Sequence, residues 1–196
     1  MLFLKKWKCA TDTDWTFTWV CASCDPATPA QPPPPSPEAV WNLLVAIAKK
    51  PVARFAPPVE RNPDIAMIYG KRLYFRADPA SFAAQSDTMT FPGGWAATGT
   101  LTPIGINFSS IGNGSVRCVG PGFDGTTRAG RAAADAAGCY LLITQGPKAG
   151  TIASRLTIRW NISVDSNIPG VALQGTTATT QPIALPVREV QSIVGR

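Results

Sequence analysis

The sequence predicts a mainly β fold: an antiparallel β-sandwich with one N-terminal helix and a Cys-containing N-terminal segment. The 196 residues include 19 prolines and 17 glycines, a turn-rich composition that disfavours long helices. Residues 156–164 alternate strictly between apolar and polar side chains, which is typical of a strand with one buried face. Several other short apolar runs follow residue 65, each bounded by Gly, Pro, Asn or Asp.

A proline-rich stretch separates an N-terminal segment from the rest of the chain. Residues 1–25 hold three of the five cysteines, and the run TFTWV at 16–20 predicts a short strand that could fold back on the first residues. Residues 26–36, PATPAQPPPPS, predict an extended and semi-rigid linker.

Residues 37–50 predict a helix that docks on the core. Ser36 is the expected N-cap and Pro37 suits the first helical position, while Pro51 would stop the helix. Apolar side chains recur at helical spacing, at Val40, Leu43, Leu44 and Ile47.

The β domain is expected to occupy residues 58–196. Its expected strands are IAMIYG, RLYFRA, WAATGTLTP, IGINFSS, SVRCV, CYLLIT, LTIRWNISV and IALPVREVQSIV. Along residues 156–164 we expect the even-numbered side chains, Trp160 among them, to be buried. Arg159 and Asn161 should face solvent or a partner.

The sequence contains none of the patterns that would predict catalysis. Histidine is absent, which removes the commonest general base and the commonest metal ligand. There is no G-x-S-x-G, no phosphate-binding loop and no suggestive pair of acids. We therefore expect a protein that is not an enzyme, with no catalytic residue, no metal and no other cofactor.

Charge and hydropathy disfavour two classes of partner. The net charge is +6, yet only Lys5, Lys6 and Lys8 form a cluster, so we expect no nucleic-acid partner. The longest apolar stretch, Trp41–Ala48, is far shorter than the roughly 20 residues of a membrane-spanning helix. Membrane association would then need a segment that is not in this chain. The opening MLFLKKWKC lacks the apolar stretch of a signal peptide, so either the protein is cytoplasmic or this chain begins after a removed or unrecognised export signal. The cysteines favour the second alternative.

The cysteines are open to several interpretations. The spacing Cys21-Ala-Ser-Cys24, with Cys9 nearby, would suit zinc or a redox pair, but zinc lacks a fourth ligand and proline-rich coil follows. We expect disulfides, which indicate a secreted or cell-surface protein. Cys9 should bridge to Cys21 or Cys24, with Cys24 preferred. Cys118 should bridge to Cys139, since the sequence between them has few large apolar residues. The fifth cysteine stays unpaired or pairs between chains.

Four short motifs follow one another in a particular order: CVGPG at 118–122, CY at 139–140, WNI at 160–162 and VREVQ at 187–191. In this order they resemble a group of secreted or surface-attached actinobacterial proteins with a PKD-like (Ig-like) β-sandwich domain and no settled function. The resemblance covers about four-fifths of the chain. It departs at SIGNG, 110–114, where the group has an acidic turn. The Asn-Gly pair still favours a hairpin there, but a carboxylate that could suit calcium is missing.

These observations predict a non-catalytic extracellular or cell-envelope structural or interaction protein, such as a subunit of a surface appendage, secretion or conjugation apparatus. Its expected partner is a protein, or further copies of itself, at the cell envelope. The expected contact surface consists of loops on a rigid scaffold with charge from two arginines: Gly112, Asn113, Gly114, Phe123, Arg128 and Arg131.

The alternative function is a carbohydrate- or peptidoglycan-binding accessory domain. It would need exposed aromatic side chains that line a sugar-binding face. We favour the interpretation of Trp95, Trp160 and Tyr140 as core residues instead.

Overall fold

The computed structural model describes residues 2–7, 16–21, 31–60, 62, 66–147 and 149–188. The chain divides into two compact units, Met1–Pro34 and Pro35–Arg196. Within the described ranges it forms eleven strands and two helices, so the fold is mainly β, as predicted. None of the helices in these ranges is long and apolar enough to cross a membrane.

The first unit contains a β-hairpin. Strands β1 (Leu2–Trp7) and β2 (Thr16–Cys21) pair antiparallel along their whole length, which confirms the predicted strand and its return onto the first residues. Cys21 is the last residue of β2. Cys9 and Cys24 lie outside the described residues, so their expected bridge stays a prediction.

The second unit begins with helix α1, Pro37–Ile47. The side chain of Ser36 accepts a hydrogen bond from the backbone N–H of Ala39 at 3.2 Å, which confirms the predicted N-cap. The helix ends at Ile47 rather than at residue 50. It buries Val40 and Leu44 completely, at 0% exposure each.

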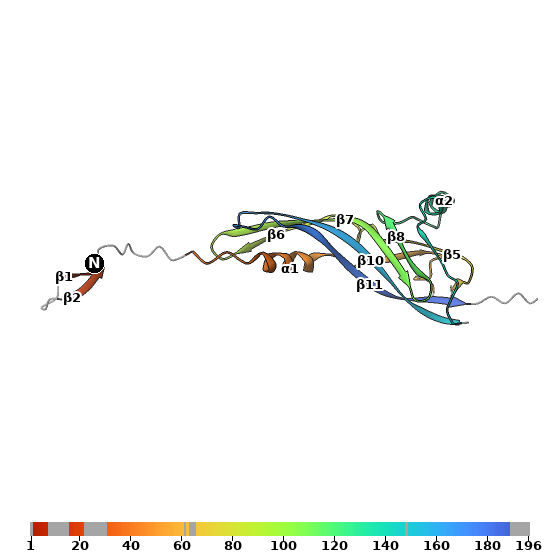
Figure 1. Cartoon of the computed structure of the whole chain (residues 1–196), viewed down its shortest axis with the longest axis horizontal. Coiled ribbons are helices and arrows are strands. Elements are labelled where there is room, and N and C mark those ends of the chain that lie inside the picture. The colour runs from red at the N-terminus through yellow and green to blue at the C-terminus, as the bar shows by residue number, and fades with distance from the viewer. Residues whose placement is uncertain are drawn as a thin grey trace, which may run out of the picture. The chain divides into compact units, whose positions relative to one another are not determined.

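A six-stranded sheet forms the main body of this unit (Figure 1). Its strand order is β4-β11-β10-β7-β6, with β8 pairing to the other end of β7. Every pair is antiparallel except β11 with β4. The strands are β4 (Met67–Ile68), β6 (Gln85–Phe91), β7 (Trp95–Ser110), β8 (Gly114–Val119), β10 (Ala149–Ser166) and β11 (Gln174–Arg188).

The central strands are longer than the sequence predicted. WAATGTLTP and IGINFSS, expected as two strands, form the single strand β7, which runs through Pro103. The pairing with β10 shifts there, because Gly105 faces Arg159 while Pro103 faces Trp160. A β-bulge explains how the strand tolerates a proline, which has no N–H for the ladder. Strand β11 likewise begins well before Ile183, in a polar run without apolar alternation.

A second sheet has the order β3-β5-β9, with β3 (Ala53–Ala56), β5 (Arg72–Ala77) and β9 (Tyr140–Leu142). It packs on one half of the large sheet, because the rings of Phe55 and Phe75 lie 5.6 Å and 4.8 Å from that of Phe108 on β7. Strands β3 and β6 were not predicted. The first has four residues, and the second, QSDTMTF, lacks a clear apolar face.

Helix α1 covers the other half of the large sheet (Figure 1). Leu44 lies so close to Gly99 on β7 that a Cβ at this position would overlap it. In the same way, a Cβ at Gly175 on β11 would lie 2.7 Å from the Trp41 ring. These two glycines let the helix approach the sheet closely.

The prediction of a single helix was wrong, because the segment after β8 contains a second one. Helix α2 spans Arg128–Ala136, with Thr127 as its N-cap. Its sequence, RAGRAAADA, is rich in alanine, the strongest helix former. Of its residues only Ala134 is buried, so the segment has no large apolar stripe from which the helix could be recognised.

The alternation predicted for residues 156–164 is confirmed in β10. Four successive inward side chains have 0% exposure: Leu156, Ile158, Trp160 and Ile162. On the other face Asn161 is exposed, whereas Arg159 is partly buried. Trp95 and Tyr140, interpreted as core residues, are only partly buried.

Trp160 joins the sheet to the end of α1. Its indole N–H donates to Thr179 Oγ1 at 2.9 Å, and that hydroxyl donates to the backbone oxygen of Lys49 at 2.7 Å.

We expect Trp160→Ala to lower the free energy of unfolding by about 3–5 kcal/mol in chemical denaturation. Asn161→Ala, the adjacent change on the exposed face, should stay within about 0.5 kcal/mol. Equal effects of the two variants would contradict this assignment of faces.

Candidate functional site

A disulfide holds the loop region of the second unit on its core. Cys118, in β8, and Cys139, just before β9, are joined with their Cα atoms 5.5 Å apart, as predicted. Both residues are buried, at 3% and 1% exposure. The bridge closes the stretch that contains α2 and the preceding loop, and thereby limits where that stretch can lie.

The residues 122–126 lie directly against β5. The N–H of Phe123 donates to the backbone oxygen of Phe75 at 3.3 Å. Gly122 has a φ of +86°, and a Cβ there would lie 2.5 Å from the same oxygen. At Gly125 a Cβ would overlap Tyr74. Only glycine fits at these two positions, so the glycine-rich run GPGFDG seats this loop on the small sheet.

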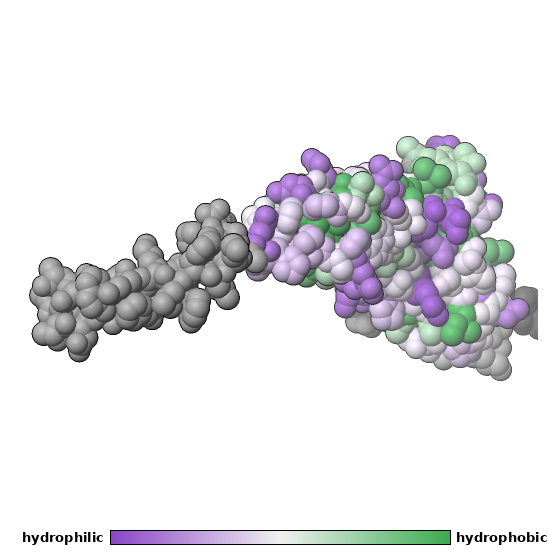
Figure 2. Space-filling model, turned by 60° about the vertical axis from the view of Figure 1, so that its left-hand side comes forward, coloured by the Kyte–Doolittle hydropathy of each residue, from purple (hydrophilic) through white to green (hydrophobic). Residues whose placement is uncertain are grey.

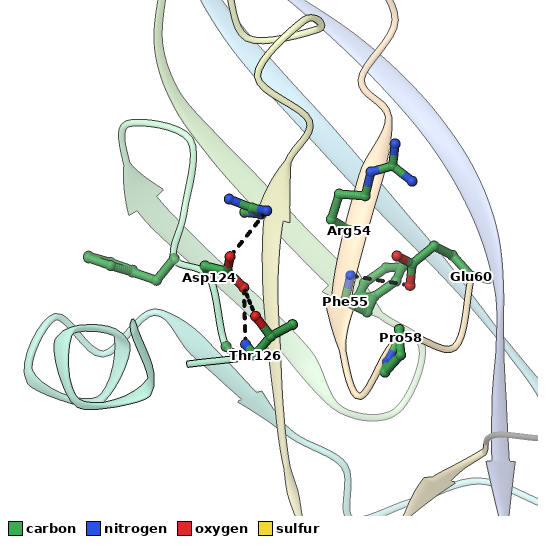
Figure 3. A pocket seen from close by; sticks show the side chains of 9 residues that line it. Arg54, Phe55, Pro58, Glu60, Asp124 and Thr126 are labelled. Atoms are coloured by element: carbon green, nitrogen blue, oxygen red, sulfur yellow. Dashed lines mark hydrogen bonds and ion pairs between the residues drawn. The ribbon is translucent and has the colours of Figure 1, made fainter. Parts of the chain in front are cut away.

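This arrangement forms a first pocket of about 170 Å³ between the loop and β3 (Figure 3). Figure 3 shows Asp124 and Thr126 on one side, with Arg54, Pro58 and Glu60 across from them. The remaining lining comes from Phe55, Arg76, Phe123 and Gly125.

The charged side chains that line the first pocket already have hydrogen-bond or ion-pair partners. Arg54 forms an ion pair with Asp78 at 2.8 Å, and Arg76 forms one with Asp124 at 3.2 Å. Glu60 accepts a hydrogen bond from the N–H of Phe55 at 3.3 Å. The pocket therefore presents oriented and largely neutralised charges.

Both paired aspartates are stabilised in the ionised form. The hydroxyl of Thr126, at 2.6 Å, and the N–H of Thr126, at 3.0 Å, hold the pKa of Asp124 below its ordinary value, although burial opposes this. The pKa of Asp78 is lowered by the hydrogen bond from Arg54 and by the N–H of Ala80. Carboxylates of this kind are poor proton donors near neutral pH, so the arrangement suits binding better than acid–base chemistry.

A second pocket, of about 500 Å³, lies on the other side of the same loop. Pro58, Gly125 and Thr126 line both pockets. The second pocket adds Ala56, Pro57, Arg72, Tyr74 and Arg131. One short loop therefore borders two hollows.

Beside the second pocket, Asp135 of α2 joins a cluster in which Arg72 makes both an ion pair and a cation–π contact. The guanidinium of Arg72 lies 4.5 Å from the centre of the Tyr140 ring and forms an ion pair with Asp135 of α2 at 2.6 Å. Tyr74 donates to the same carboxylate at 3.1 Å. The side chain of Tyr74, then the charge of Asp135, raises the pKa of Arg72. These contacts attach α2 to the outer face of the small sheet.

The two loops predicted to form one contact surface lie at opposite ends of β8. The hairpin turn comes at its start, where Gly114 pairs with Ser110, and the Phe123 loop follows its end, where Val119 pairs with Gly105. Asn113 has a structural role: its Oδ1 accepts from the N–H groups of Thr144 and Gln145 at 2.7 Å and 2.9 Å. The turn takes its positive φ at Gly112 and Gly114 rather than at Asn113.

The predicted residues near α2 have three different environments. Phe123 is partly buried against the core and is not a free loop side chain. Arg131 donates to the backbone oxygens of Gly125 and Thr126 at 2.8 Å and 3.3 Å, so it supports the loop. Arg128 is exposed at the first position of α2.

Several pocket residues were missed by the sequence analysis: Arg54, Glu60, Arg72, Tyr74 and Arg76. A signal for three of them was present in RLYFRA, because polar positions alternate there with Leu73, Phe75 and Ala77. Arg54 and Glu60 gave no comparable signal, since β3 is only four residues long.

No protein family, curated protein or solved structure matches the chain. In the described residues, no three side chains of Cys, Asp or Glu come together as a group that could hold a metal ion. On the face seen in Figure 2, hydrophilic and hydrophobic residues are interspersed rather than gathered into one apolar patch.

We expect the double variant Cys118→Ala/Cys139→Ala to lose about 3 kcal/mol of unfolding free energy, because the bridge restricts the unfolded chain. Urea denaturation measures the loss, and a non-reduced digest of the wild type should contain the linked peptide pair. A reductant should lower wild-type stability by a similar amount and leave the variant unchanged. Free thiols at both positions in protein from an oxidising compartment would contradict the bridge.

The lowered pKa values predict that stability falls in acid. Because the folded pKa of Asp124 lies below its unfolded value of about 3.9, its ionised form stabilises the fold above that pH. This contribution is lost as the pH falls through the folded pKa. Urea denaturation from about pH 5 to about pH 2 should therefore show a shallower decline for Asp124→Asn than for the wild type. Parallel curves would show that Asp124 has the same pKa in both states.

Proposed function

We propose that the protein is a non-catalytic binding module of the cell surface or the extracellular space, with the Phe123–Thr126 loop and α2 as its contact surface for a protein partner. The observation that carries the proposal is the buried Cys118–Cys139 bridge. Intrachain disulfides persist in oxidising compartments, and this one fixes the loop and helix on the core. A rigidly held loop is typical of recognition surfaces.

The chemistry of the two pockets supports binding. Four charged side chains, Arg54, Asp78, Arg76 and Asp124, are held in pairs. Such pairs give a partner an oriented pattern of donors and acceptors without a reactive group whose pKa is near neutral. Arg128 adds an exposed positive charge at the edge of this surface.

We further propose an antiparallel Ig/PKD-like sandwich as the architecture of the second unit, and a role in a surface appendage, secretion or conjugation apparatus. The packing of the small sheet on the large one supports the first of these. The proposed relationship to actinobacterial surface proteins rests on the order of the CVGPG, CY and WNI motifs. Fold alone does not determine activity, so the apparatus has to be identified by experiment.

The alternative, a carbohydrate site built on aromatic rings, receives less support at this surface. Two partly exposed aromatic residues lie at this surface: Tyr74 lines the second pocket and donates to Asp135, and Arg72 already covers the face of the Tyr140 ring. A sugar would have to displace this guanidinium together with its ion pair to Asp135.

The location can be tested by fractionating the source cells and labelling free thiols before lysis. We expect the protein in the envelope or the medium, with Cys118 and Cys139 protected until a reductant is added. Cytoplasmic protein with both thiols free would overturn the proposal. Turnover of a glycan, peptide or ester above background would also overturn its non-catalytic part.

The contact surface can be tested by crosslinking in an envelope fraction. We expect Arg128→Glu to weaken partner capture with little change in melting temperature, because this exposed side chain makes no ion pair with the described residues. Lys50→Glu, an equal reversal of charge beyond the end of α1, is the matched control. Equal capture by both variants would place the contact elsewhere.

A further inference from the structure

The large sheet has a second face, opposite to the core, that is polar and faces solvent. The register places Arg117, Asn107, Thr157 and Thr180 in one row across β8, β7, β10 and β11. Thr157 lies between the buried Leu156 and Ile158, so this row lies on the side away from the core. Arg155 and Arg159, two residues on either side of Thr157, share this face.

The three arginines form an open triangle. Arg155 and Arg159 are four residues apart on β10, which corresponds to roughly 13 Å of strand. Arg117 lies two strands away, or about 10 Å, in the row midway between them. At these backbone spacings an extended chain can contact all three.

No acidic side chain neutralises this triangle among the described residues. The ion pairs there involve Arg54, Arg72 and Arg76, all of which belong to the small sheet. On the outer face of β10 the nearest acid is Asp165, six residues beyond Arg159. Three positive charges therefore remain without a counter-charge on one flat surface.

The guanidinium of Arg159 lies against the sheet, but one of its N–H donors lacks a hydrogen-bond acceptor. A Cβ at Gly105 would lie 3.0 Å from Nη2 of Arg159, so the glycine leaves room for the guanidinium on the sheet. The Nε of Arg159 is buried and has no hydrogen-bond acceptor. An unsatisfied buried donor of this kind is costly, and it leaves the remaining N–H groups of the guanidinium to bind an acceptor.

Two shallow hollows lie beside these arginines. One of about 480 Å³ is lined by Arg155 together with Ser109, Thr180 and Pro182. The other, of about 320 Å³, is lined by Arg159 together with Ile104, Thr176 and Ala178. Each hollow thus combines one guanidinium with hydroxyl groups.

We propose that this face binds a linear acidic polysaccharide, with Arg117, Arg155 and Arg159 contacting successive anionic groups. Guanidinium groups pair with carboxylate or phosphate oxygens, and the hydroxyl and amide groups between them match sugar hydroxyls. The site differs from the Phe123–Thr126 surface. The choice of a glycan rests on the proposed extracellular location, but the binding surface does not.

A single-stranded nucleic acid fits this face less well. Among the described residues of β7, β8, β10 and β11, those on the outer face include no aromatic side chain on which a base could stack. A protein partner receives less support, because the central row of the face is polar, with Asn107 and Thr157. The exposed apolar side chains of Ile104 and Val119 lie to one side of that row, near Arg159.

The test measures binding of the full chain to polygalacturonate, which carries one carboxylate per sugar, and to polyphosphate, at low ionic strength. Arg117→Gln/Arg155→Gln/Arg159→Gln should bind about tenfold more weakly. The control Lys49→Gln/Lys50→Gln/Lys71→Gln removes the same charge elsewhere and should bind like the wild type. Because Arg159 is partly buried, Arg117→Gln/Arg155→Gln, which changes only exposed residues, provides a second variant that should keep the wild-type melting temperature.

Comparison of the two polymers distinguishes phosphate from carboxylate as the anionic group. Binding of either polymer that is weakened in the arginine variants supports the site. Equal loss in the arginine and lysine variants would overturn it, because net charge alone would then explain binding. Tighter binding of duplex or single-stranded DNA would overturn the glycan assignment, and so would binding of no polyanion. These outcomes are independent of the location and crosslinking tests, so a failure here is distinguishable from a failure of the proposed function.

Discussion

Two long strands, β7 and β10, bury one face of the large sheet along most of their length, and β11 adds Leu185 and Val187 near its end. The rest of the second unit is arranged to cover that face. No single element is long enough to cover this face, so α1 covers one half of it and the small sheet covers the other. The alternation of β7 has to be reset between the halves, because Leu101 and Ile106 both point into the core although they are five residues apart. The extra residue at the Ile104 bulge provides the reset, and it lies opposite Arg159 and Trp160.

The position of the Gly122–Thr126 loop depends on this same arrangement. Once the small sheet is packed against Phe108, the outer side of β5 presents Arg72, Tyr74 and Arg76 at alternate positions. The Gly122–Thr126 segment and α2 then attach to that side through backbone contacts and through Asp124 and Asp135. The disulfide also closes the segment at its base. The loop is therefore restrained by backbone contacts, by ion pairs and by a covalent bridge. A loop held in this way loses little conformational entropy when it binds a partner.

The arginines of the small sheet and those on the outer face of the large sheet differ in whether they have acidic partners. Each of the three arginines in the strands of the small sheet, Arg54, Arg72 and Arg76, has an acidic partner. On the outer face of the large sheet, Arg117, Arg155 and Arg159 form no ion pair with another described residue. Paired charges give a local and specific pattern to a protein partner, whereas unpaired charges create a field that attracts polyanions over a longer range. A module with both surfaces could connect a protein assembly to a charged polymer.

The sequence by itself determined the features that depend on local pattern. Strict alternation in residues 156–164 identified β10, Ser36 and Pro37 identified the start of α1, and the placement of Cys118 and Cys139 beside two strand-like runs indicated their bridge. Only the tertiary structure decided which polar residues meet. Arg54, Arg76 and Asp124 come from segments far apart in the chain, and neither pairing register nor the bulge at Pro103 can be derived from composition. Helix α2 was missed for a different reason: its local signal is alanine propensity without an apolar stripe, and only the structure shows its contacts to β5.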